Sequence, residues 1–150
     1  MASADNIGSL RLTDRVGLWI GMFVMAAVFP TAAFAQEALK GFRSPTGNVQ
    51  CMFFDASAVR CSTSAVSNRL PHRPADCDLE WGHDFGLAAG SREGERLCVG
   101  DTIADDYPVL PYGESAHHGA ILCHSARKGI TCTNIGGAGF ELSRSQQRVF

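Results

Sequence analysis

The sequence predicts a small, mainly β domain held together by disulfide bonds. Short apolar segments alternate with turn signals about every dozen residues, and no long segment has the period of an amphipathic helix. The six cysteines all follow residue 50, and an even number of cysteines in a short exported chain is typical of a disulfide framework. These observations leave a sandwich and a barrel equally open.

The first 35 residues have the pattern of a secretory signal peptide. Arg11 and Arg15 precede an apolar run, and Ala33-Phe34-Ala35 forms a small-x-small cleavage site. An uncleaved anchor is the alternative, because a run of about 18 apolar residues approaches the length that spans a bilayer. We expect cleavage, which leaves residues 36–150 as a single exported β-rich domain, either periplasmic or secreted.

Charge excludes two classes of partner. The chain has 13 Lys and Arg against 15 Asp and Glu, a net charge of −2, and no stretch is strongly basic. Binding to nucleic acid or to an anionic membrane needs a concentrated basic surface. We therefore expect no nucleic-acid partner, and no membrane contact after cleavage.

The first hairpin is predicted from a turn and an alternating strand. Pro45 and Gly47-Asn48 indicate a turn over 44–48. Residues 49–53 then alternate, with Val, Cys and Phe on one face and Gln and Met on the other. The chain returns over 59–61, which completes the hairpin.

The stretch from Gly119 to Cys132 repeats this arrangement. In both stretches a glycine lies four positions before the first cysteine, and a β-branched residue lies two before the second. This predicts two hairpins with bridges Cys51–Cys61 and Cys123–Cys132, which leaves Cys77 to pair with Cys98. Chance similarity is the alternative, and fifteen connectivities are formally possible.

Between the hairpins, residues 62–76 are predicted to be a proline-containing loop and residues 79–89 a strand with clear alternation. Gly82 and Gly86 suggest bending or close packing within that strand. A turn over 89–95 and a short strand over 97–99 follow. Near the end, Phe140 and Leu142 form a strand face, and Ser143 or Ser145 is expected to cap a final helical turn. Residues 149–150 are expected to fold back onto the core, or to form a docking tail.

Four phrases give the chain a resemblance to a known family: FRSPTGNVQC, LCVGDT, VLPYGES and GITCTNIGGAGFELSRSQQRVF. In this order they resemble a family of small exported bacterial domains of unknown function, with F-x-S-P-S/T-G-N near the start and G-F-x-L-S-R near the end. The resemblance covers residues 41–150. It implies export and a shared cysteine-containing fold, and it brings no activity, cofactor or catalytic residue.

Histidines form the densest cluster of candidate metal ligands. His117, His118 and His124, with Glu114, offer imidazole and carboxylate groups that zinc and copper accept. Adjacent residues on a strand face opposite ways, however, so a solvated loop is the competing interpretation. His83 lies on the apolar face of the 79–89 strand, where it is either a binding or pH-sensitive group or a hydrogen-bonded core histidine.

Two further groups lie in predicted loops. Asp101, Asp105, Asp106 and Glu114 match neither a calcium-loop pattern nor a catalytic motif, and no GxSxG sequence is present. Tyr107, Leu110 and Tyr112 form an aromatic and proline-rich patch with Pro108 and Pro111. If exposed, this patch would be a recognition surface, and if buried it would be a packed turn.

These observations predict an exported, disulfide-stabilised, non-enzymatic binding or structural module of the bacterial cell envelope, without a cofactor. Its partner would be an unidentified protein or small ligand. One alternative is a small envelope hydrolase or metal-dependent enzyme that uses His83 or the His117, His118 and His124 group. Another is a secreted effector or inhibitor.

Overall fold

A computed structural model describes residues 40–54, 57–101 and 103–150. These belong to one compact unit, Gln36–Phe150. The predicted signal peptide over residues 1–35 lies outside the described residues, as does part of the connection between the strands of the first hairpin.

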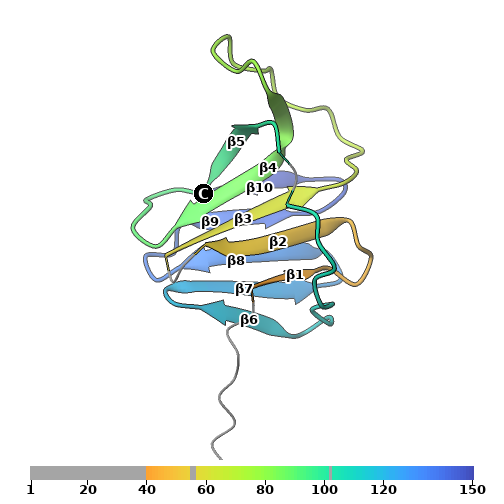
Figure 1. The fold of residues 1–150 in the computed structure, drawn as a ribbon, viewed down its shortest axis with the longest axis vertical. Coiled ribbons are helices and arrows are strands. Elements are labelled where there is room, and N and C mark those ends of the chain that lie inside the picture. Colours follow the sequence, from red (N-terminus) through yellow and green to blue (C-terminus); the bar gives the residue numbers. More distant parts are fainter. Residues whose placement is uncertain (1–39, 55–56, 102) are drawn as a thin grey trace, which may run out of the picture. The chain divides into compact units, whose positions relative to one another are not determined.

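The described residues form two antiparallel sheets of five strands each (Figure 1). In both sheets every strand pairs with the next one along the chain, and the mainly β fold class is therefore confirmed. The first sheet contains β1 (Gly41–Arg43), β2 (Val49–Phe54), β3 (Ala58–Thr63), β4 (Glu80–Ala88) and β5 (Glu95–Val99). The second contains β6 (Ser115–His118), β7 (Ile121–Ala126), β8 (Gly129–Asn134), β9 (Gly139–Leu142) and β10 (Gln147–Val149).

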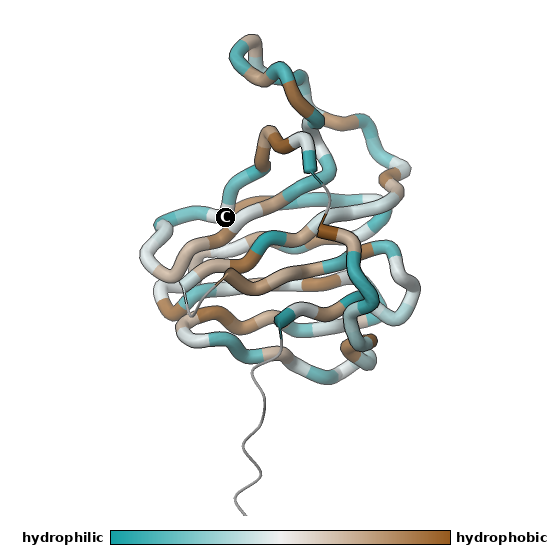
Figure 2. The backbone as a smooth tube through the Cα atoms, in the orientation of Figure 1, coloured by the Kyte–Doolittle hydropathy of each residue, from teal (hydrophilic) through white to brown (hydrophobic). Residues whose placement is uncertain are grey.

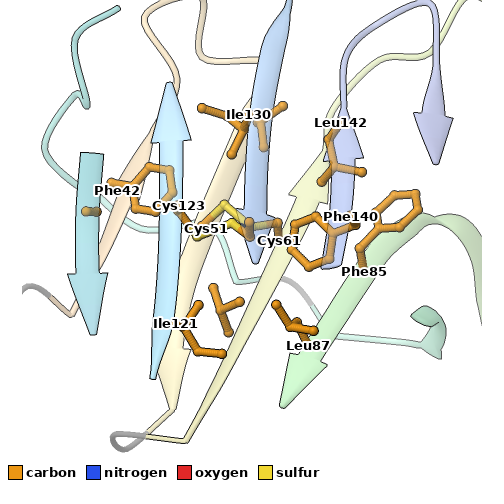
Figure 3. Close-up of a cluster of buried hydrophobic side chains, with 14 of the residues drawn as sticks. Phe42, Cys51, Cys61, Phe85, Leu87, Ile121, Cys123, Ile130, Phe140 and Leu142 are labelled. Atoms are coloured by element: carbon orange, nitrogen blue, oxygen red, sulfur yellow. Dashed lines mark hydrogen bonds between the residues drawn. A yellow bond between two sulfur atoms is a disulfide. The ribbon is translucent and has the colours of Figure 1, made fainter. Parts of the chain in front are cut away.

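The two sheets share one hydrophobic core, which makes the fold a β-sandwich. Apolar residues alternate with polar ones along the strands (Figure 2), and the inward-facing set from both sheets forms a single buried cluster (Figure 3). Phe85 of β4 packs against Phe140 of β9, with ring centroids 6.0 Å apart. Aromatic contacts of this kind add stability beyond the area that they bury.

All three predicted disulfides are present. Cys51–Cys61 joins β2 to β3 and Cys123–Cys132 joins β7 to β8, and the Cα atoms lie 4.0 Å apart in each pair. Facing positions on adjacent antiparallel strands come this close where no backbone hydrogen bond joins the pair. Cys77–Cys98 attaches the loop before β4 to β5. The described cysteines are all paired.

The internal repeat extends beyond the two hairpins to both sheets. Cys61 lies opposite Phe85 on the next strand, and Cys132 lies opposite Phe140 in the same way. Each sheet therefore presents the same row of a disulfide and a phenylalanine to the core. This matching register explains why two segments with limited sequence similarity build two similar layers.

The segment after β5, teal in Figure 1, returns across the outer face of the first sheet to β1. Arg60 of β3 holds this segment against the sheet, because its guanidinium donates hydrogen bonds to the side chain and the carbonyl of Asp101. The same guanidinium pairs with Asp84 of β4 at 2.9 Å, and both side chains are buried. Further along, Val109 forms a parallel bridge with Arg43 at the edge of the sheet.

Several details differ from the sequence prediction. The expected strand over 79–89 is one residue shorter at each end, and Leu79 is exposed. A bulge at Gly82, whose φ is +104°, shifts the pairing of this strand, and Leu97 packs on Gly86. The prediction that Ser143 or Ser145 caps a helical turn was wrong: Ser143 stabilises a β-turn, because its hydroxyl accepts from the amide of Gln146.

The chain end behaves as expected, with Val149 packed against the core. Within the part of the chain that the structure describes, we find no helix of the length and apolarity needed to span a bilayer.

Candidate functional site

A pocket opens at one end of the sandwich, where three turns meet. These turns connect β1 to β2, β7 to β8 and β9 to β10, and Ser64 and Tyr112 contribute from neighbouring loops. The pocket encloses about 410 Å³, which lies within the range of small-ligand sites. It is lined by Ser44, Thr46, Gly47, Asn48, Val49, Ser64, Tyr112, Ala126, Arg127, Lys128, Gly129, Leu142, Ser143 and Arg144.

The turn before β2 is held in place by its own side chains. The buried Ser44 hydroxyl accepts a hydrogen bond from the amide of Val49 at 3.1 Å. Gly47 has a φ of +71°, a conformation that glycine adopts without strain. Asn48 then accepts hydrogen bonds from the next segment, through its carbonyl from the Ser64 amide and through its side chain from the Ala65 amide. This wall of the pocket is therefore preorganised.

The opposite wall is formed by two turns of the second sheet. Arg127 and Lys128 are the two central residues of the β7–β8 hairpin, since Ala126 pairs with Gly129. A Cβ atom on Gly129 would lie 2.2 Å from the carbonyl oxygen of Leu142, so the two turns pack closely because this residue is glycine. Close packing of the turns fixes where their side chains project.

The pocket is positively charged. Arg127, Lys128 and Arg144 line it, and none of the described residues in its lining is acidic. Outside the lining, Glu141 pairs with Lys128 at 3.0 Å and with Arg148 at 3.3 Å. Hydrogen bonds from Lys128 and then from Arg148 hold the pKa of the Glu141 carboxyl below its usual value.

Aromatic and hydroxyl groups complete the lining. The guanidinium carbon of Arg127 lies 5.4 Å from the ring centroid of Tyr112, a cation–π contact. The hydroxyl of Ser64 makes no hydrogen bond among the described residues and can donate or accept one, whereas those of Ser44, Thr46 and Ser143 form hydrogen bonds within their own turns. The site can therefore bind a polar molecule through charge, hydrogen bonds and a ring face.

The predicted aromatic patch is divided by the fold. Tyr107 and Leu110 are buried, while Tyr112 is 39% exposed and lines the pocket. Burial, followed by the nearby charge of Asp105, raises the pKa of Tyr107. The structure thus brings only Tyr112 of these three residues into a candidate site.

His83 is half-buried in β4 and joins this strand to β3. Its Nδ1 lies 2.9 Å from the carbonyl oxygen of Thr63, which can only accept, so Nδ1 carries the proton. The Thr63 hydroxyl donates in return to the carbonyl of His83. The geometry is that of a half-buried histidine whose hydrogen bonds join two strands, and a binding role for His83 stays a prediction.

The structure divides the three clustered histidines between the two faces of β6 and β7, and a metal-binding role for them stays a prediction. His117 and His124 are exposed, whereas His118 stacks on Phe53 with ring centroids 4.8 Å apart. His124 lies 3.0 Å from the Ser115 hydroxyl on the exposed face of the second sheet. Among the described residues, one group of three possible metal ligands has its atoms within 4.8 Å of one another: Cys51, Cys61 and Cys132, whose sulfurs are in disulfides.

The acidic loop residues have separate positions. Asp101 binds Arg60, and this hydrogen bond lowers the pKa of the Asp101 carboxyl. Asp105, Asp106 and Glu114 are exposed. None of these carboxylates lines the pocket.

The sequence analysis missed Arg127, Lys128 and Arg144. A usable signal was present, because alternate turns of an antiparallel meander lie at the same end of a sheet. The hairpin turn at 127–128 and the turn after Leu142 are two strands apart. Their cationic residues therefore lie at the same end of the second sheet. The β1–β2 turn lies beside these two turns because of how the two sheets pack, and the sequence pattern does not predict that packing.

Comparison with known proteins identifies one relationship. The sequence profile of a family of unknown function, DUF6636, matches residues 21–150. No curated protein and no solved structure matches the chain. Because the match covers most of the sequence, the chain belongs to the DUF6636 family.

Proposed function

We propose that this protein is an exported, non-enzymatic module of the bacterial cell envelope that binds a small ligand in the pocket at the turn end of the sandwich. The observation that carries this proposal is the convergence of three turns on one preorganised pocket lined by charged, hydroxyl and aromatic groups. Binding sites commonly lie on loops that a rigid scaffold positions.

Export is supported by the three disulfides, because such bonds persist in oxidising compartments. The mass of the protein recovered from the exported fraction tests this part. We expect a chain that begins at Gln36 and gains six hydrogens on reduction, two for each disulfide. A full-length chain would contradict cleavage after Ala35 and would indicate the uncleaved anchor instead. Free thiols in the unreduced protein would contradict folding in an oxidising compartment.

The phrases that carry the family resemblance support the location of the site. SPTGN near the start of the domain supplies Ser44 and its turn, and LSR near the end supplies Arg144. These segments are far apart in the sequence, and the sandwich brings them to the same pocket.

The lining also supports binding rather than catalysis. General acid–base chemistry most often uses His, Asp or Glu, and the pocket lining contains none of them. Its charged side chains are those of Arg127, Lys128 and Arg144, and these groups are hydrogen-bond donors suited to the recognition of a polar ligand.

Amide NMR spectra of the purified, disulfide-bonded protein test the site. We would titrate a set of neutral, cationic and anionic fragments, and we expect shifts at residues 44–48, 127–129 and 143–144. Ser64→Phe places a ring at the pocket wall and should abolish these shifts. Ser57→Phe, in the exposed turn between β2 and β3, is the matched control. Shifts that persist in Ser64→Phe, or an absence of binding by every fragment, would exclude a ligand site in the pocket.

A further inference from the structure

The pocket concentrates positive charge on a protein whose net charge is −2. Three cationic residues line it, and they come from two turns that pack together through Gly129 and Leu142. Because the chain as a whole is slightly acidic, this concentration does not follow from a basic composition. It is a local property of the pocket.

Two of the three cations lack a counter-ion. Within the described part of the chain, the side chains of Arg127 and Arg144 make no hydrogen bond or ion pair. Arg127 has a cation–π contact with the ring of Tyr112, which carries no opposite charge. Lys128 shares Glu141 with Arg148, so one carboxylate serves two cations there. Like charges held together raise each other's energy, and a bound anion would relieve this cost.

The remaining lining limits the size and type of the anion. A space of about 410 Å³ suits a small organic molecule, and guanidinium groups recognise planar or tetrahedral oxyanions through paired N–H donors. The hydroxyl of Ser64, which makes no hydrogen bond among the described residues, and the face of Tyr112 are available to a polar body.

We infer that the pocket binds a small organic oxyanion, with a phosphate or carboxylate group between Arg127 and Arg144 and a hydroxyl-bearing body toward Ser64 and Tyr112. This inference rests on the proposed function and specifies its ligand class. Phosphate and carboxylate share this chemistry, and the experiment separates them.

The test compares three sugars of similar size on the purified, disulfide-bonded protein: glucose, glucuronate and glucose 6-phosphate. Inorganic phosphate and acetate serve as minimal probes. We expect at least one of the charged sugars to bind, to shift the amides of residues 127–129 and 143–144, and to bind more weakly as salt is added. Whichever charged sugar binds more tightly identifies the preferred group.

Arg144→Gln removes one guanidinium and should weaken binding about tenfold or more, because hydrogen bonds to charged groups contribute strongly to affinity. Arg92→Gln makes the same charge change in the turn between β4 and β5, at the opposite end of the sandwich, and should leave affinity unchanged.

Three results would overturn the inference. Glucose could bind as tightly as the charged sugars, in which case the ligand site stands and the oxyanion assignment falls. Arg92→Gln could weaken binding as much as Arg144→Gln, which would indicate general charge attraction. The third result is that none of the anions binds, in which case the oxyanion assignment falls. The fragment titration decides separately whether the pocket binds small molecules at all.

Discussion

The Sγ atoms of Cys61 and Cys132 lie 3.9 Å apart at the centre of the core, one from each sheet. Both belong to disulfides that cross neighbouring strands, so two bridges are in van der Waals contact where the sheets face each other (Figure 3). This contact lies beside that of Phe85 and Phe140, which follow the two cysteines on the next strands. The repeated halves of the chain therefore meet through equivalent residues.

The first prediction uses this proximity. Cys51→Ser leaves the Cys61 thiol beside the Cys123–Cys132 disulfide. Its thiolate can attack Sγ of Cys132, which forms Cys61–Cys132 and releases Cys123 as the thiolate. Peptide mapping of the unreduced variant at mildly alkaline pH should therefore find the Cys61–Cys132 bridge together with the native one. Detection of the native Cys123–Cys132 bridge alone would contradict this.

A stability change should accompany Cys51→Ser. Loss of a bridge that closes a loop of this size costs about 3 kcal/mol in the free energy of unfolding. The double variant Cys77→Ser with Cys98→Ser loses a bridge of similar entropic effect without leaving a thiol. It should be destabilised comparably in urea titrations and should keep both core disulfides as the sole pairings.

The second prediction concerns the buried ion pair beneath the segment that follows β5. Arg60→Met leaves the Asp84 carboxylate buried without its partner and should lower the free energy of unfolding by about 3 to 5 kcal/mol. Asp101→Asn removes only the exposed ion pair with Arg60 and should lower the free energy of unfolding far less. Urea titrations of both variants check this ranking, and equal losses would show that Asp84 is not the critical partner.

The third prediction concerns Gly129, whose φ is +142°. Gly129→Ala adds a Cβ that would clash with the Leu142 carbonyl, so we expect a loss of about 2 kcal/mol or more in the free energy of unfolding. Gly113→Ala is the matched control, because its φ is +89° and no atom lies within 4 Å of the added Cβ. A smaller loss for Gly129→Ala than for Gly113→Ala would contradict close packing of the turns at the pocket.

The fourth prediction is a pH dependence that arises from Glu141. Its pKa is lowered in the folded protein, so its contribution to stability is complete above its usual value of 4.5 and is lost as pH falls through the lower, folded value. Glu141→Gln lacks this contribution at every pH. When the pH is lowered from about 7 to about 3, the free energy of unfolding of this variant should therefore fall less than that of the natural chain.

Urea midpoints across this range measure the effect of Glu141→Gln. Glu93→Gln, in an exposed turn and without an ion pair among the described residues, is the control and should follow the natural chain. Identical acid profiles for the natural chain and Glu141→Gln would show that the Lys128 and Arg148 contacts do not stabilise the charged carboxylate.

Much of the fold follows from local patterns in the sequence. Cysteines nine or ten positions apart, each on an alternating segment, fixed both hairpins and both core bridges, because facing strand residues must come close. Very short strands such as β1 and β10 give too little alternation for recognition. The serine at 143 was misassigned because the same side-chain hydrogen bond caps helices and stabilises turns.

The candidate site was less predictable, since it joins residues that are distant in the sequence. Tyr107 and Tyr112 look equivalent in the sequence, yet the return of the chain over the first sheet buries one and exposes the other. Arg127 and Arg144 lie on alternate turns of the second sheet, so the meander places both at the same end of that sheet, but only the packing of the two sheets forms the pocket that they line. Their significance depends on the tertiary fold rather than on any motif.

Crystal structures of the protein soaked with glucose 6-phosphate and with glucuronate test the central claim most directly. We expect at least one of these sugars in the turn-end pocket, with its phosphate or carboxylate oxygens at hydrogen-bond distance from the guanidinium groups of Arg127 and Arg144 and the sugar against Ser64 and Tyr112. If both sugars lie elsewhere, or if the pocket holds only water at saturating concentration of each, the assignment of this pocket as an oxyanion site is wrong.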